Sequence, residues 1–171
     1  THYLPKLEAA GRFLFLIRPR RFGKSLLQSV MECYYDRNYI ESFERLFGDT
    51  WIYDHPTPEK HRYLVLRFDF SAVNPDSRKL EESFETYMRI VLENFLRRYR
   101  QCIPEEQAAR VLREQTTSAR LEQLFYQMNE LSLPLYLLID EYDNFANSLL
   151  VTEGREKYQE LTHSGGVFKH F

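Results

Sequence analysis

The sequence predicts a three-layer α/β sandwich, in which helices cover both faces of a mostly parallel sheet. Three apolar segments, 12–17, 62–70 and 135–140, have the composition of buried strands. Segments with apolar residues at helical spacing separate them along the chain. The chain has 171 residues and 43% of them are hydrophobic, so it is long enough to bury a core of its own.

The first half of the chain is predicted to contain two strands and two helices. The segment 12–17 reads Arg-Phe-Leu-Phe-Leu-Ile and predicts a strand, followed by a Gly-Lys-Ser turn and a helix over 25–36. The segment 43–48 predicts a short helix that its final glycine ends. Prolines predict a loop over 54–61. The β-branched and aromatic run at 62–70 predicts the second strand.

The second half is predicted to be three helices followed by a strand. A long amphipathic helix over 77–100 carries a stripe that we expect to pack in the core: Leu80, Phe84, Met88, Val91 and Phe95. A helix over 104–114 begins at a proline, and Ser118 is expected to cap the next helix at 119–131. We expect Leu121, Leu124, Phe125 and Met128 to lie on one side of that helix. The strand at 135–140 completes the pattern.

Composition and charge narrow the class of protein. The net charge is −2, so the whole chain is not a general binder of polyanions. Cys33 and Cys102 have neither metal-ligand nor redox spacing, and we expect reduced thiols in the core. No apolar run reaches the ~18–20 residues of a membrane span, so we expect a cytoplasmic protein. Because the chain begins with Thr1 and ends in apolar residues, we expect the N-terminal part of a longer protein, truncated at its C-terminal end.

The stretch between the first strand and the first long helix predicts a nucleotide-binding P-loop. Gly23 allows the backbone to approach a phosphate closely, Lys24 can reach the β- and γ-phosphates, and the Ser25 hydroxyl can bind Mg²⁺. The strand–turn–helix context aims the amino end of the helix at the phosphates. The residues expected to contact the nucleotide are Pro19, Arg20, Arg21, Phe22, Gly23, Lys24, Ser25 and Leu26.

The start of this loop departs from the common pattern. Arg18 stands where a glycine usually opens the loop, and Pro19 biases Arg18 toward extended geometry. We therefore expect the strand to continue through Arg18 and the turn to begin at Pro19. Arg20 and Arg21 either place positive charge near phosphate oxygens or are surface residues at a loop tip, and the sequence leaves both open.

A second motif lies at the end of the last predicted strand. Asp140 is expected to hold Mg²⁺, and Glu141 to activate the attacking water. The alternative is a buried strand whose first exposed residues are acidic by chance. At the end of the second strand, Asp69 and Ser71 either hold Glu141 in an inactive conformation or form an ordinary strand-end cap.

Together these motifs resemble those of the AAA-ATPase-like family. The resemblance lies in the segments "FLIRPRRFGKSLL" and "LLIDEYDNF", with weaker similarity in "HYLPKLEAAGRF" and "FDFS". The resemblance implies that residues 1–171 form one AAA-like P-loop NTPase domain of the additional-strand type, using ATP and Mg²⁺. It also makes Arg18 a family feature. Many such proteins carry a PD-(D/E)XK nuclease-like domain after the ATPase part, which would bring nucleic acid as a partner, and a second copy of the chain is another expected partner.

The sequence leaves three functions open. The first is an ATPase, with Lys24 and Glu141 as catalytic residues, that drives conformational change in attached domains. The second is a non-catalytic nucleotide-binding scaffold. The third is a small-molecule kinase, which is less favoured because adjacent carboxylates at 140 and 141 suit water as the phosphate acceptor and no arginine-rich lid is evident.

Overall fold

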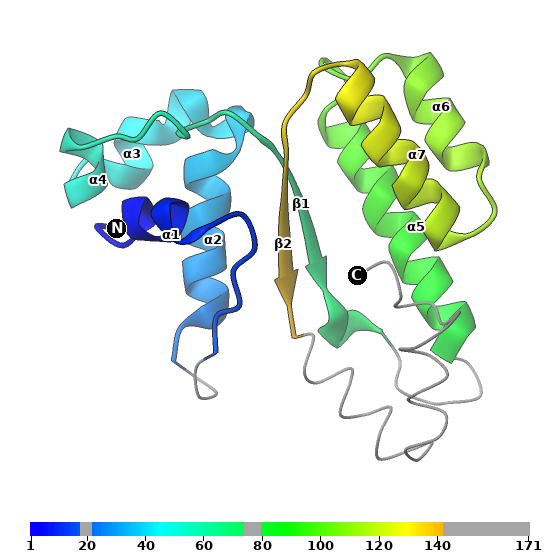
Figure 1. The fold of residues 1–171 in the computed structure, drawn as a ribbon, viewed down its shortest axis with the longest axis horizontal. Coiled ribbons are helices and arrows are strands. Elements are labelled where there is room, and N and C mark those ends of the chain that lie inside the picture. Colours follow the sequence, from blue (N-terminus) through cyan, green and yellow to red (C-terminus); the bar gives the residue numbers. More distant parts are fainter. Residues whose placement is uncertain (18–21, 74–79, 142–171) are drawn as a thin grey trace. The chain divides into compact units, whose positions relative to one another are not determined.

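The computed structural model describes residues 1–17, 22–73 and 80–141. Within these residues the chain has seven α-helices, two short 3₁₀ helices and a parallel sheet of two strands (Figure 1). This mixed α/β architecture agrees with the predicted fold class, whereas the described part does not contain a full three-layer sandwich. The chain divides into two compact units: unit 1 is Thr1–Leu66 with Pro134–Leu138, and unit 2 is Arg67–Leu133 with the residues from Ile139 onward.

Unit 1 is a cluster of short helices. Its longest helix, α2 (Lys24–Tyr35), coincides with the helix predicted over 25–36. Gly48 ends α3 as predicted. The other members are α1 (Leu4–Ala10), the 3₁₀ helix η1 (Arg37–Ser42), α3 (Phe43–Phe47) and α4 (Trp51–Asp54). Helices α1 and α4 were not predicted from the sequence, because seven and four residues are too few to show a clear periodicity.

Aromatic and aliphatic side chains share the core of unit 1. Tyr34 and Tyr35 are fully buried on α2, with ring centroids 5.2 Å apart. Glu8 on α1 accepts hydrogen bonds from the hydroxyls of Tyr35 and Thr57, at 3.0 and 2.8 Å. Burial, reinforced by the Glu8 carboxylate, raises the pKa of Tyr35 above its ordinary value. The buried hydroxyls therefore have partners, and these partners attach α1 to α2.

The predicted strand at 12–17 is not a strand in the structure. Residues 13–17 have no regular secondary structure, and the side chains of Phe13, Phe15 and Ile17 are about nine-tenths exposed. The prediction was wrong because an apolar, aromatic composition favours a strand only where another strand supplies hydrogen-bond partners.

The sheet pairs the other two predicted strands, β1 (Leu64–Asp69) and β2 (Leu135–Asp140). Both arrows point the same way in Figure 1. Leu64, Val65, Leu66 and Phe68 of β1 are buried, as expected for a strand covered on both faces. On β2, Leu137 and Ile139 are exposed while Leu138 and Asp140 are buried, so only one face of this strand is covered by the described residues. The expectation of two covered faces was thus right for β1 alone.

Unit 2 contains three helices that pack against one another: α5 (Leu80–Arg98), α6 (Glu105–Arg113) and α7 (Thr117–Glu130). Phe84, Met88 and Phe95 of the predicted α5 stripe are buried, whereas Val91 is half-buried and its neighbour Leu92 is fully buried. Of the four apolar residues expected on one side of α7, Leu121, Leu124 and Met128 are buried and Phe125 is exposed.

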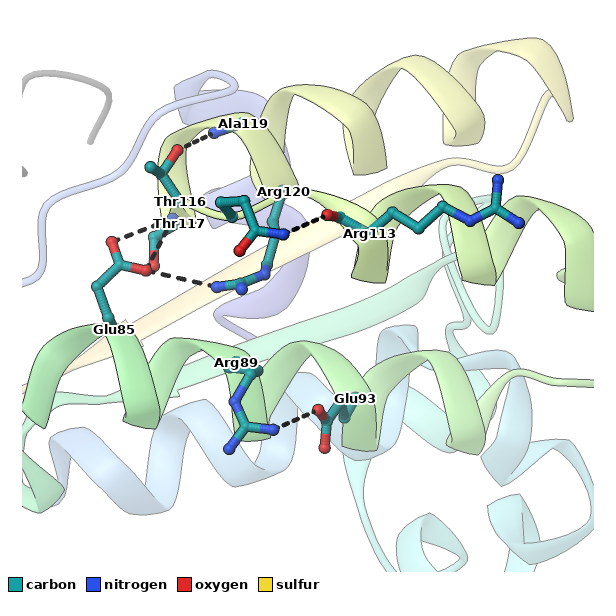
Figure 2. A network of polar contacts seen from close by, with 9 residues as sticks. Glu85, Arg89, Glu93, Arg113, Thr116, Thr117, Ala119 and Arg120 are labelled. Atoms are coloured by element: carbon teal, nitrogen blue, oxygen red, sulfur yellow. Dashed lines mark hydrogen bonds and ion pairs between the residues drawn. The ribbon is translucent and has the colours of Figure 1, made fainter. Parts of the chain in front are cut away.

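The start of α7 differs from the prediction and forms a polar network with α5 (Figure 2). The N-cap is Thr116 and not Ser118, since the Thr116 hydroxyl accepts a hydrogen bond from the Ala119 N–H at 3.3 Å. The Glu85 carboxylate on α5 accepts from the Thr117 N–H, at 3.0 Å for one oxygen, and faces the Arg120 guanidinium at 3.4 Å. This carboxylate thus satisfies a backbone N–H of the first turn of α7 and pairs a buried arginine.

Candidate functional site

The amino end of α2 has the geometry of an anion-binding turn. Gly23 is its N-cap and has a left-handed backbone, with φ of 74°. No side chain of the described residues caps the helix, and its first turn contains no acidic residue. The first intrahelical bond runs from the Leu27 N–H to the Gly23 carbonyl at 2.9 Å, which leaves the N–H groups of residues 24–26 without a helical acceptor. Such a terminus attracts negative charge through both its N–H groups and its dipole.

The side chains at this turn also leave the amino end of α2 accessible to a ligand. Lys24 is half-buried, and Phe22, Ser25 and Leu26 are exposed. Among the described residues, neither the Lys24 ammonium nor the Ser25 hydroxyl has a hydrogen-bond or ion-pair partner, while the Ser25 carbonyl accepts from the Ser29 hydroxyl at 2.9 Å. A cation and a hydroxyl without internal partners lie beside uncapped N–H groups, a combination that suits a phosphate.

The predicted contacts at Pro19, Arg20 and Arg21 lie outside the described residues, as does Arg18. The structure therefore tests neither the role of these arginines nor the effect of replacing the loop's first glycine by Arg18. Both stay predictions.

The acidic strand end lies in unit 2 and is built around Asp140. Its side chain is only 5% exposed, at the last position of β2. One carboxylate oxygen, Oδ1, accepts from the Glu141 N–H at 3.0 Å, and the other, Oδ2, lies 3.7 Å from Nη2 of Arg67 on β1. The buried charge is therefore compensated from both sides, as a buried carboxylate requires.

Glu141 follows β2 in a left-handed conformation, with φ of 54°. This value is uncommon for a residue with a side chain, and it breaks the strand immediately after Asp140. Glu141 is half-buried, and its carboxylate has no hydrogen-bond or ion-pair partner in the part of the chain that the structure describes. Within the described ranges, the Glu141 carboxylate is thus not engaged by another residue.

At the end of β1, the structure supports the simpler of the two interpretations. Asp69 accepts a hydrogen bond from the Ser71 N–H at 3.1 Å and caps the 3₁₀ helix η2 (Phe70–Ala72), so the strand-end cap is confirmed. The Asp69 N–H donates to the Tyr87 hydroxyl of α5 at 2.6 Å. Burial raises the pKa of Tyr87, although the hydrogen bond from Asp69 acts in the opposite direction.

Two residues beside Asp140 and Asp69 were missed from the sequence. Arg67 was visible as the one charge that interrupts the apolar run of β1 before Asp69, and a charge within a buried strand indicates a buried partner. Tyr87 gave no signal, because its contact with Asp69 depends on how α5 packs.

The chemistry of the donors fits Mg²⁺ with a nucleotide. Mg²⁺ prefers oxygen ligands and is commonly held by one or two carboxylates together with substrate phosphates and waters. In unit 2, Asp140 provides such a carboxylate, with Arg67 as its positively charged neighbour. The described residues contain no group of three or more His, Cys, Asp or Glu that could hold a metal. The donors thus suit an ion that arrives with phosphate oxygens and not a metal held by protein groups alone.

The predicted site residues are divided between the two units: Gly23, Lys24 and Ser25 belong to unit 1, and Asp140 and Glu141 to unit 2. Each half has the local geometry described above. None of the helices in the described ranges is both long and apolar enough to cross a membrane.

Comparison with known proteins gives one result for the whole chain. The model of the AAA-ATPase-like family, described as a predicted AAA-ATPase, matches residues 1–171. Searches of curated proteins and of solved structures give no match.

Proposed function

This chain belongs to the AAA-ATPase-like family, and from that premise we propose that it binds ATP and hydrolyses it with Mg²⁺. Residues 1–171 then act as an ATPase domain in which hydrolysis drives conformational change in attached domains or partners. The family description supports the use of ATP. The assignment of roles to residues is ours.

The observation that carries the proposal is the uncapped amino end of α2. Gly23 has a left-handed backbone there, and Lys24 and Ser25 have no partner among the described residues. Phosphate oxygens would accept from the free N–H groups of the first turn and from the Lys24 ammonium, while Ser25 would contribute its hydroxyl to Mg²⁺. We assign the remaining predicted loop contacts, Pro19 to Phe22 and Leu26, to the same nucleotide.

The acidic strand end supplies the second half of the chemistry. Asp140 would hold Mg²⁺, directly or through water, and Mg²⁺ when bound neutralises charge on the phosphate oxygens. Glu141 would accept a proton from the attacking water as the water oxygen bonds to the γ-phosphorus and ADP leaves. Its carboxylate is available for this role because no described residue pairs with it.

The test of binding is Lys24→Ala, compared with Lys6→Ala, which removes an exposed lysine of α1. Titration with a fluorescent ATP analogue should show a loss of affinity of about 100-fold for Lys24→Ala, because charge-assisted hydrogen bonds to phosphate are lost. Lys6→Ala should bind like the wild type. Unchanged affinity in a folded Lys24→Ala variant would remove the phosphate-binding assignment.

Phosphate release separates hydrolysis from the alternatives. An ATPase releases phosphate from ATP and Mg²⁺ without an added acceptor. A kinase would consume ATP only when an acceptor is present, and a scaffold would bind ATP without consuming it.

A further inference from the structure

Arg67 occupies the side of Asp140 that a metal ion would need. Oδ1 of Asp140 already accepts from the Glu141 N–H, so Oδ2 has more of its acceptor capacity left for an external ligand. Nη2 of Arg67 lies 3.7 Å from Oδ2. The Asp140 side chain is 5% exposed and that of Arg67 is 29% exposed, so solvent screens this pair only in part.

The position of Arg67 on β1 gives it a second acidic neighbour. Arg67 and Asp69 are two residues apart in the strand and therefore lie on the same face. Both influence the electrostatics of the Tyr87 hydroxyl, which accepts from the Asp69 N–H. The guanidinium is always charged and has five N–H donors. The Arg67 guanidinium can therefore move away from the Asp140 carboxylate and keep a favourable environment near that of Asp69.

Mg²⁺ and the guanidinium cannot both use Oδ2 without cost. Mg²⁺ requires oxygen ligands at 2.0–2.1 Å, or an ordered water between itself and the carboxylate. A guanidinium at ion-pair distance from the same oxygen occupies that space and repels a second positive charge. Arginine does not lose its proton in proteins, so the conflict can be relieved only by movement of the side chain.

We propose that Arg67 is a resident counter-ion that competes with Mg²⁺ for Asp140 and thereby weakens the metal dependence of nucleotide binding. The proposal rests on the proposed function, because it requires Asp140 to hold Mg²⁺. When no metal is bound, Arg67 compensates the buried carboxylate. When Mg²⁺ arrives with the nucleotide, Arg67 moves away from Oδ2.

The test measures how much Mg²⁺ tightens nucleotide binding, and it does not use activity. A fluorescent non-hydrolysable ATP analogue is titrated in excess Mg²⁺ and again in EDTA. For each variant, the dissociation constant in EDTA is divided by that in Mg²⁺, and this ratio rises as Mg²⁺ tightens binding more. Arg67→Gln should raise this ratio about tenfold over the wild type, as expected when a competing charge is removed. Arg67→Lys keeps a charge and should stay close to the wild type.

The matched control is Arg89→Gln. It removes an arginine of the same unit, on α5, whose exposed ion pair with Glu93 at 3.0 Å is drawn in Figure 2. Its ratio should equal that of the wild type. Circular dichroism establishes that each variant is folded. If Arg67→Gln does not fold, the ratio for Arg67→Met, which keeps much of the side-chain volume, replaces it.

The outcomes separate this inference from the function on which it rests. If Asp140→Asn keeps the wild-type ratio, Asp140 does not hold the metal, and the proposed role of Asp140 fails together with the inference. If Asp140→Asn lowers the ratio while Arg67→Gln leaves it unchanged or lowers it, the role of Asp140 stands. Arg67 is then a positioning residue for the carboxylate and not a competitor of the metal.

Discussion

Among the described residues, His61, Ser132 and Glu141 have left-handed backbones although they are not glycines. Each costs about 1–2 kcal/mol relative to a right-handed or extended residue. At Glu141 the hydrogen bond from its N–H to Asp140 offsets part of this cost. Unfavourable backbone geometry persists where the surroundings enforce it, and such positions cluster at functional sites. We therefore interpret the left-handed conformation of Glu141 as part of the acidic strand end.

His61 couples its left-handed backbone to an unusual protonation equilibrium. Its Nδ1 lies 3.0 Å from the Asp36 carbonyl oxygen, and its Nε2 is buried without a partner in the described structure. Burial lowers the pKa of His61, and the nearby Lys60 lowers it further, against the opposing effect of Asp36. The neutral ring is thus favoured in the folded state.

We predict that His61 makes the protein less stable in mild acid. The unfolded chain binds a proton at this ring near its ordinary pKa of about 6.5, whereas the folded chain binds it only at lower pH. The contribution to stability is therefore full above pH ~6.5 and declines as pH falls toward the folded pKa. In urea unfolding, His61→Asn, which tolerates a left-handed backbone and does not titrate, should lose less stability between pH 8 and pH 5 than the wild type. Equal losses would show that His61 is not responsible.

At the scale of elements, the sequence predicted those whose signal is local. The helices α2, α5, α6 and α7 have apolar residues at helical spacing, and the bounds of β2 agree at both ends. The cap of α7 was placed two residues late because Thr116, Thr117 and Ser118 are all good capping residues. The exposure of Phe125 also lay beyond the sequence, since an apolar stripe does not reveal how wide the buried side of a helix is.

The candidate site shows the same limit. Gly23, Lys24, Ser25, Asp140 and Glu141 were recognised because their types and spacing report chemistry directly. Arg67 and Tyr87 were not recognised, because their contacts join residues that are distant in the sequence. The strand predicted at 12–17 failed for a related reason: whether an apolar segment becomes a strand depends on a partner elsewhere in the chain.

The link between α5 and α7 gives a prediction for stability. Glu85→Ala removes two interactions at once, the acceptor of the Thr117 N–H and the partner of the buried Arg120 (Figure 2). Leaving a buried charge unpaired costs about 3–5 kcal/mol, and because the Glu85 side chain is 31% exposed we expect about 2–3 kcal/mol in urea unfolding. Glu93→Ala on the same helix breaks the exposed pair with Arg89 and should cost less than about 0.5 kcal/mol. Similar losses for the two variants would mean that the Arg120 pair stabilises no more than a surface one.

At the scale of the whole molecule, the two motifs belong to different units, and strands β1 and β2 contribute residues to both units. Lys24 and Asp140 have different tasks in the proposed function: Lys24 contacts phosphate with or without metal, and Asp140 acts only through Mg²⁺. Nucleotide binding, its dependence on Mg²⁺ and the rate of ATP hydrolysis should therefore respond separately to mutation. The linkage between ligand binding and folding stability makes this separation measurable on the intact protein.

We predict that ATP with Mg²⁺, at 100 times its dissociation constant, raises the free energy of unfolding of the wild type by about 2.7 kcal/mol. EDTA at the same ATP concentration should reduce this stabilisation, because Asp140 then has no metal to hold. Asp140→Asn should show a smaller effect of EDTA, since it removes a formal charge that faces the ion.

Glu141→Gln should keep the full stabilisation by ATP and Mg²⁺ but release no phosphate, because an amide cannot accept the proton of the attacking water. Equal phosphate release by Glu141→Gln and the wild type would remove Glu141 from catalysis. Loss of ATP stabilisation in both variants would instead show that Asp140 and Glu141 form a structural acidic end of β2, because a carboxylate that only activates water contributes little to holding the nucleotide.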